Sequence, residues 1–156
     1  MVDRYSSFVT VNNNWMDGGW SQGEMLPGCK SNGVEIYGAN ASDAILSNQI
    51  QNHNWYGITA NGVSSLTVGN ESGFAANQIV NNASSGLSIG DDLGVCSTSI
   101  TFSTDNISGN GAYGVENDQG TGTCSLSLSK LTSVSLSGNK LGSYNFTCGS
   151  GGITCS

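Results

Sequence analysis

The segment Ile79-Val80-Asn81-Asn82-Ala83-Ser84-Ser85-Gly86-Leu87 recurs in variant form along the chain. Each copy has an apolar residue, then a polar residue, then a small residue that is followed directly by an apolar or aromatic one. The other copies are Ile50-His53-Gly57-Ile58, Ile107-Asn110-Gly114-Val115, Leu136-Asn139-Ser143-Tyr144 and, more faintly, Leu26-Cys29-Gly33-Val34. The leading apolar residues are spaced 24, 29, 28 and 29 positions apart. A period of this length indicates stacked structural repeats.

After the small residue of each copy, apolar and polar residues alternate, as they do in a strand with one buried face. The residues predicted to face inward are Val34 and Ile36, Ile58 and Ala60, Leu87 and Ile89, Val115 and Asn117, and Tyr144 and Phe146. Those predicted to face outward are Glu35, Thr59, Ser88, Glu116 and Asn145. Further strands fit residues 66–68, 100–102 and 126–128. Three short strands per repeat predict a β-solenoid, and the consensus of the leucine-rich repeat is absent.

The composition supports one domain of short strands rather than helices. Among 156 residues there are 23 Gly and one Pro, and only 10% are charged, which disfavours long helices. The net charge of −7 excludes the basic surface that binds nucleic acid or anionic lipid. No apolar run approaches the roughly 20 residues that span a bilayer. We therefore expect neither a nucleic-acid nor a membrane partner.

Two copies of the repeat, Asn77-Gln78-Ile79-Val80-Asn81-Asn82 and Asn106-Ile107-Ser108-Gly109-Asn110-Gly111, share an Asn-x-Ile-x-x-Asn pattern. On these motifs, residues 26–146 resemble the pectate-lyase-like superfamily, which includes pectate lyases, polygalacturonases, alginate epimerases and bacteriophage tailspikes. The resemblance implies an all-β chain, a right-handed single-stranded parallel β-helix of about five turns with three short strands each and no substantial α-helix. It also implies a polysaccharide partner and, for a tailspike, a homotrimer.

The repeats divide the single domain into three parts. Residues 1–25 are expected to form an incomplete N-terminal turn and a Trp-containing loop, residues 26–146 the regular repeats, and residues 147–156 a C-terminal tail. The open strand edges of a β-helix need a cover. No amphipathic helix precedes the strand expected at residues 8–11, so we expect a fragment of a longer chain.

Stacking turns every column of the repeat into a ladder with a step of about 4.8 Å. The polar column is predicted to form a ladder of turn residues whose amides bond along the axis, namely Cys29, His53, Asn82, Asn110 and Asn139. His53 is the only histidine, and two roles are open to it: a structural place in this ladder, which is favoured, or a catalytic base.

The chain has five cysteines, so at least one has no partner within it. Cys96 and Cys124 occupy equivalent positions on neighbouring turns, which allows either a disulfide or a stacked pair of free thiols. Cys148 and Cys155 are a second candidate pair, which leaves Cys29 as the odd thiol. Disulfides would favour an extracellular location: secreted, at a cell surface or on a virion.

Four carboxylates are expected to gather on neighbouring turns, namely Asp91, Asp92, Glu116 and Asp118. Adjacent carboxylates can supply the acid and base of glycosidic-bond hydrolysis, or they can chelate calcium; no other cofactor or metal is expected. Residues 85–92 look a little like a polygalacturonase segment. The Gly-His-Gly and Arg-x-Lys motifs of that family are missing, which favours a solvated acidic loop.

Exposed aromatic side chains are the second candidate site, because their faces can stack on sugar rings. Trp15 and Trp20 flank a Gly-containing turn, and Trp55 and Tyr56 open another turn. Glu35, which points outward on the strand after the small residue, is added to this candidate binding site. An equal alternative is that the aromatics cap an open end of the coil.

These observations leave three interpretations of function. The favoured one is a carbohydrate-recognising β-helix segment of a tailspike-like or secreted surface protein. The second is a polysaccharide hydrolase or lyase that uses the acidic cluster, and the third is a structural spacer. No convincing catalytic constellation is present, so the sequence favours binding over catalysis.

Overall fold

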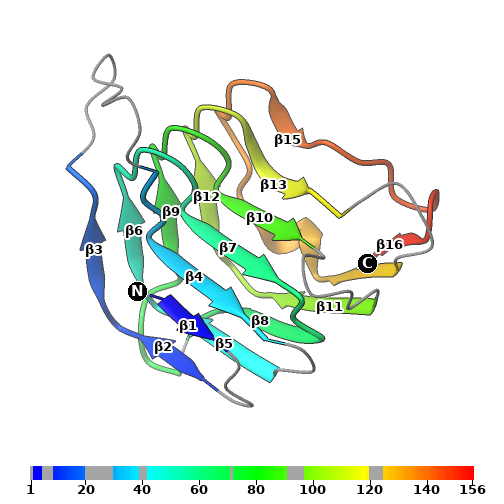
Figure 1. Ribbon diagram of the computed structural model, residues 1–156, viewed down its shortest axis with the longest axis horizontal. Coiled ribbons are helices and arrows are strands. Elements are labelled where there is room, and N and C mark those ends of the chain that lie inside the picture. Colours follow the sequence, from blue (N-terminus) through cyan, green and yellow to red (C-terminus); the bar gives the residue numbers. More distant parts are fainter. Residues whose placement is uncertain are drawn as a thin grey trace.

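The computed structural model describes residues 2–4, 9–19, 30–38, 42–70, 72–90, 97–119 and 125–156. These residues form a parallel β-helix built from three parallel sheets, here called sheets A, B and C. Figure 1 shows the turns stacked side by side, with β1 at one end of the stack and β15 and β16 at the other. The all-β solenoid with three short strands per turn is thus confirmed, and the described residues contain no α-helix.

Sheets A and B each take one strand from six successive turns, and sheet C takes one from four of them. Sheet A contains β1 (Val2–Arg4), β4 (Val34–Tyr37), β7 (Ile58–Asn61), β10 (Leu87–Gly90), β13 (Tyr113–Asn117) and β15 (Gly142–Tyr144). Sheet B contains β2 (Thr10–Asn12), β5 (Ser42–Leu46), β8 (Ser65–Gly69), β11 (Ser97–Phe102), β14 (Ser125–Ser129) and β16 (Ile153–Cys155). Sheet C contains β3 (Trp15–Asp17), β6 (Gln49–Gln51), β9 (Gln78–Val80) and β12 (Asn106–Ser108). A 3-10 turn, η1 (Leu131–Ser133), precedes a bridge that joins Ser135 to β12.

The core is a column of apolar side chains that the three sheets point inward. In sheet A, Leu87 pairs with Ile58 on one side and Val115 on the other, and all three are fully buried. Ile50 and Ile79 are stacked in the same way in sheet C. Burial of a full aliphatic side chain contributes roughly 1.5–3 kcal/mol, so this column is the main source of stability.

The first turn differs from the sequence-based alignment. Met16 pairs with Ile50, so Met16, and not Leu26, occupies the leading apolar position of that turn. The segment expected to be an incomplete turn supplies β1, β2 and β3, which pair with β4, β5 and β6. The alignment failed because extra residues follow β3 and shift the period, whereas the pairing of Val34 with Ile58 is as predicted.

Two inward positions in sheet A are in the predicted register but less buried than their neighbours: Tyr144 pairs with Val115 and Asn117 with Ile89, and Val115 and Ile89 are both fully buried. Tyr144 is 41% exposed, because it lies on β15 and no described strand of sheet A follows it. Its ring stacks on Phe146, which is partly buried against the core, with the two ring centroids 4.8 Å apart. Asn117 is half-buried rather than buried, and its backbone N–H donates to Oδ1 of Asn145.

The predicted amide ladder is present at the corner after sheet C. The backbone N–H of His53 donates to Oδ1 of Asn82, that of Asn82 to Asn110, and that of Asn110 to Asn139, at 3.0–3.1 Å. The predicted first member, Cys29, lies outside the described residues. Each amide satisfies backbone groups at two corners, which a buried turn requires.

A second ladder, which the sequence analysis missed, lies at the corner before sheet C. The backbone N–H of Asn14 donates to Oδ1 of Asn48, that of Asn48 to Asn77, and that of Asn77 to Asp105. Asn48, Asn77 and Asp105 are all buried. The signal was in the repeat, because each of these residues stands two positions before the leading apolar residue of its turn.

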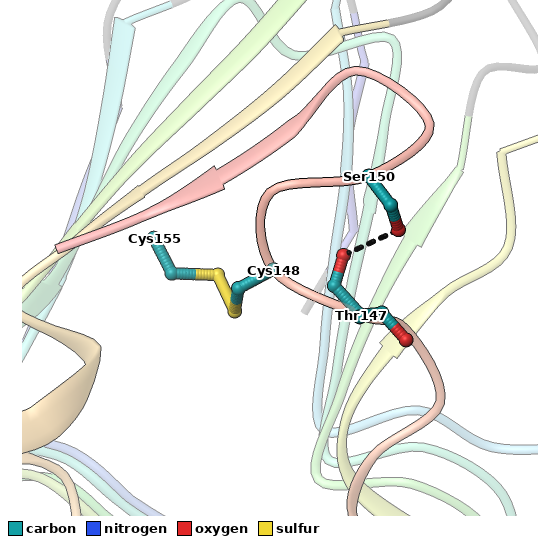
Figure 2. Close-up of a disulfide and its surroundings, with 4 residues drawn as sticks. All are labelled: Thr147, Cys148, Ser150 and Cys155. Carbon is teal, nitrogen blue, oxygen red and sulfur yellow. Dashed lines mark hydrogen bonds between the residues drawn. A yellow bond between two sulfur atoms is a disulfide. The ribbon is translucent and has the colours of Figure 1, made fainter.

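A disulfide joins Cys148 to Cys155, with the Cα atoms 5.5 Å apart, as the sequence predicted. Figure 2 shows the bond and the adjacent turn, where the Ser150 hydroxyl donates to the backbone oxygen of Thr147. The bond ties the C-terminal segment to β16, and a disulfide of this kind favours an oxidising compartment. The other predicted pair, Cys96 and Cys124, lies outside the described residues. Within the described part of the chain, no helix is long and apolar enough to cross a membrane.

Candidate functional site

The outer face of sheet A carries a small cleft of about 160 Å³. Its floor comes from β4, β7 and β10, and one wall comes from the corner that precedes β7. Ten residues line it, mostly polar or aromatic: Lys30, Asn32, Glu35, Tyr37, Trp55, Tyr56, Thr59, Asn61, Ser88 and Asp118. The cleft therefore brings together Trp55, Tyr56 and Glu35, three of the residues that the sequence singled out for carbohydrate binding.

Strand register places the floor residues in two outward-facing rows that run across the strands. Glu35 pairs with Thr59 and Thr59 with Ser88, so these side chains share one row across three turns. Tyr37 pairs with Asn61 in the next outward row. Tyr37 and Asn61 were not predicted as site residues, although two-residue alternation from Glu35 and Thr59 points to them.

Trp55 and Tyr56 form an aromatic wall of the cleft, and contacts with each other and with the next turn hold them in place. The rings of Trp55 and Tyr56 are stacked, with centroids 4.8 Å apart and planes 26° apart. The backbone oxygen of Trp55 accepts from the backbone N–H of Ser84 on the next turn, at 2.8 Å. Gly57 follows directly and packs against that turn, so the corner cannot shift without breaking the stack.

Asn32 connects the aromatic wall to the acidic floor. Its Nδ2 donates to Oε2 of Glu35 at 3.2 Å, and its Oδ1 accepts from the backbone N–H of Tyr56 at 3.3 Å. The neighbouring Ser31 donates its backbone N–H to Oδ1 of Asn54 at 2.6 Å. These bonds fix the position of the Glu35 carboxylate relative to the Tyr56 ring.

The Tyr56 hydroxyl lies over the next turn. It hydrogen-bonds to the side chains of Ser84 and Ser88. Burial raises the pKa of Tyr56, and the nearby carboxylates of Glu116 and Asp118 raise it further. The phenol is therefore neutral at physiological pH, where it serves as a hydrogen-bonding group and not as a base.

Thr59 and Ser88 were predicted to face outward, and they do, yet both are buried: their exposed fractions are 6% and 2%. The hydroxyl Oγ1 of Thr59 is fully enclosed and has no hydrogen-bond partner among the described residues. An enclosed hydroxyl without a partner costs about 1–3 kcal/mol of stability.

Only half of the predicted acidic cluster can be placed. Asp118 lines the cleft and is exposed, whereas Glu116 is half-buried and accepts a hydrogen bond from the Ser85 hydroxyl. Both lie on the side of sheet A that faces Tyr56. Asp91 and Asp92 lie outside the described residues. No group of three or more His, Cys, Asp or Glu residues in the described part of the chain could hold a metal ion.

The predicted aromatic residues do not form one surface. Trp15 is 74% exposed and lies on β3, where it pairs with Gln49 in sheet C, away from the cleft on sheet A. Trp20 lies outside the described residues. The Trp55 ring instead meets Lys30, whose Nζ is 3.7 Å from the ring centroid.

His53 occupies the ladder and not the cleft. It is 7% exposed, and its Nε2 atom has no hydrogen-bond partner among the described residues. Burial lowers the pKa of His53, while a hydrogen bond to the backbone of Met16 and the charge of Asp17 oppose the effect. The side chain is neutral above its ordinary pKa and does not face the cleft residues.

The remaining question is whether known proteins share this arrangement. Comparison of the chain with protein-family models, with curated proteins and with solved structures finds no match.

Proposed function

We propose that this chain is a carbohydrate-recognising β-helix segment of a secreted or surface-exposed protein, related to the pectate-lyase-like superfamily, and that the cleft on sheet A holds the glycan. The observation that carries the proposal is the aromatic wall of Trp55 and Tyr56 standing over a floor of hydroxyl, amide and carboxylate groups. Sugar rings offer apolar C–H faces and hydroxyl edges, and such a site complements both.

The size of the cleft favours a polymer over a small molecule. Enclosed small-molecule pockets usually measure about 300–1,000 Å³. A cleft of about 160 Å³ covers only part of a ligand. A chain of sugars that lies across the turns of sheet A would engage the cleft with one unit and the sheet with others. The disulfide Cys148–Cys155 supports an extracellular location for such a protein.

The test compares two matched Trp→Ala variants on a glycan array and by isothermal titration calorimetry. Trp55→Ala should abolish binding of the selected glycan, because it removes the stacking face, while Trp15→Ala on sheet C should bind as the wild type does. Loss of binding in Trp15→Ala alone would move the site to sheet C. Circular dichroism should show that both variants keep the β-sheet signal.

A polysaccharide-degrading enzyme is the second candidate. The observation in its favour is that Glu116 and Asp118 stand two positions apart beside Tyr56. Glu116 lies on β13 and Asp118 directly follows that strand, and alternate residues of an extended chain have Cα atoms roughly 6.5–7 Å apart. Inverting glycosidases hold their two carboxyl groups roughly 6.5–9.5 Å apart. A reducing-end assay on wild type, Glu116→Gln and Asp118→Asn decides: release of reducing ends that either variant abolishes would establish cleavage of glycosidic bonds, and hydrolysis if no ultraviolet-absorbing unsaturated product appears.

A further inference from the structure

The cleft carries carboxylate groups, whose negative charge favours some glycans over others. Glu35 and Asp118 line it, and Glu116 lies close enough to influence Tyr56. Against these carboxylates, Lys30 is the one basic residue among the ten lining residues. The whole chain has a net charge of −7, so the surrounding field also attracts cations and repels anions.

The structure already contains an ammonium group in this cleft. Nζ of Lys30 lies 3.7 Å from the centroid of the Trp55 ring. A tryptophan face is the strongest aromatic partner for a cation, and the stacked Tyr56 ring behind it fixes its orientation. Lys30 is exposed and carries a flexible side chain, so it can leave the ring when another cation arrives.

The floor also contains a buried hydroxyl without a hydrogen-bond partner among the described residues. Thr59 is 6% exposed, and its Oγ1 has no partner among the described residues. It lies in the same outward row as Glu35 and lines the same cleft. Because Oγ1 is enclosed, a ligand at this floor meets the more exposed carboxylates of Glu35 and Asp118 instead.

We propose that the cleft recognises glycans that carry free amino groups, with the sugar ammonium replacing Lys30 at the Trp55 face between Glu35 and Asp118. This inference rests on the proposed function and narrows its ligand class to amine-bearing sugars. It also disfavours polyuronates, because their carboxylates would meet Glu35 and Asp118 with Lys30 as the single cation of the cleft lining to neutralise them. Lys30 acts as an internal competitor for the ligand.

The test measures affinity by titration calorimetry for three soluble oligomers of equal length: a β-1,4-linked glucosamine oligomer, its fully N-acetylated form, and an oligogalacturonate. A mildly acidic buffer keeps the amine protonated and the carboxylates ionised. The glucosamine oligomer should bind most tightly, and added salt should weaken its binding. Tighter binding of the oligogalacturonate, or equal binding of the acetylated form, would overturn the inference.

Charge variants identify the groups responsible. Glu35→Gln and Asp118→Asn should each weaken binding of the glucosamine oligomer about fivefold at low salt, the usual scale of one exposed charge pair. Asp17→Asn removes the same charge from exposed β3 in sheet C and should have no effect. Lys30→Gln should tighten binding because it removes the competitor. Weaker binding in Lys30→Gln would contradict the role given to Lys30.

The outcomes separate the inference from the proposed function. If all three oligomers bind equally and Trp55→Ala abolishes that binding, the cleft is a glycan site without amine preference, and only the inference fails. If no oligomer binds and the wider glycan array is also blank, the proposed function fails. Selective binding of the amine-bearing oligomer that Glu35→Gln weakens supports both.

Discussion

The backbone N–H of His53 donates to the side-chain oxygen of Asn82, 3.1 Å away at the equivalent corner of the next turn. The backbone N–H of Asn82 donates in turn to Oδ1 of Asn110, and that of Asn110 to Oδ1 of Asn139, so one histidine and three asparagines form a single column. His53 differs from the others in having an ionisable ring. It is buried, and Nε2 lacks a partner among the described residues, so protonation of this ring opposes folding.

The first prediction concerns the pH dependence of stability. Burial lowers the pKa of His53 in the folded state below its ordinary value of 6.5. The unfolded chain therefore binds the proton more readily, and the free energy of unfolding falls as the pH drops from 6.5 toward the lowered pKa. His53→Asn should remove this loss, since asparagine already occupies the column at Asn82, Asn110 and Asn139. Urea unfolding of both proteins across this pH range measures the difference.

The control for this prediction is the behaviour above pH 7. There the histidine is neutral in both states, so the difference in stability between wild type and His53→Asn should be constant. A difference that keeps changing above pH 7, or that fails to change below 6.5, would contradict the assignment of the effect to His53.

The second prediction concerns the ladder before sheet C, which ends in Asp105. Burial raises the pKa of Asp105, while its hydrogen bonds from Asn77 and Ser103 oppose that rise. Because the folded pKa is raised, the stability that Asp105 contributes at low pH is lost as the pH rises through that pKa. Asp105→Asn should then increase the free energy of unfolding at neutral pH by on the order of 1 kcal/mol. Denaturant melts at neutral and acidic pH should show that the gain vanishes in acid.

Asp17 provides a control of opposite sign. It is exposed, and hydrogen bonds from Gln51, Gly19 and Asn52 lower its pKa. Its contribution is present above the ordinary pKa of 3.8 and is lost as the pH falls through the lowered value. Asp17→Asn should therefore give no gain at neutral pH. A loss of stability in Asp105→Asn would mean that its charged hydrogen bonds outweigh burial.

The sequence predicted the repeat and the register wherever the period was kept, because inward side chains and corner residues must match their neighbours on the next turn. Ile58, Leu87 and Val115 were placed correctly for that reason. It could not place Met16 against Ile50, because an insertion between turns leaves no periodic signal. It found Trp55, Tyr56 and Glu35, but not that Trp15 lies on another sheet, since a period does not reveal which corner a loop covers.

The third prediction concerns the C-terminal disulfide. Cys148 and Cys155 close a short loop beside β16, whose Ile153 is buried against the core. The chain-entropy argument gives about 2 kcal/mol for a loop of this length. The double variant Cys148→Ser, Cys155→Ser should lower the free energy of unfolding by about this amount. A matching loss in the wild type on mild reduction, measured by denaturant melts, would tie the effect to the bond; an unchanged midpoint would contradict it.

The fourth prediction concerns the column of small residues at or directly before the start of the strands of sheet A, namely Gly33, Gly57, Gly86, Gly114 and Ser143. A Cβ atom at Gly57 would lie 2.6 Å from Cγ2 of Ile79 and 2.8 Å from both Nδ2 of Asn82 and the backbone oxygen of Gly86. Two of these atoms belong to the next corner, which the Asn82 ladder holds in place. Gly57→Ala should therefore force the turns apart and lower the free energy of unfolding by about 1–3 kcal/mol, the usual cost of overpacking.

Ser143 is the matched control for Gly57, because it occupies the same column but is exposed, and no further corner of the described chain stacks on it. Ser143→Ala should change stability by less than about 0.5 kcal/mol. Thermal and urea melts of the two alanine variants make the comparison. If Gly57→Ala is as mild as Ser143→Ala, close stacking of the corners does not explain why glycine occupies the column. Gly57→Ala should also weaken glycan binding, because Gly57 directly follows Trp55 and Tyr56 and its displacement would move both rings.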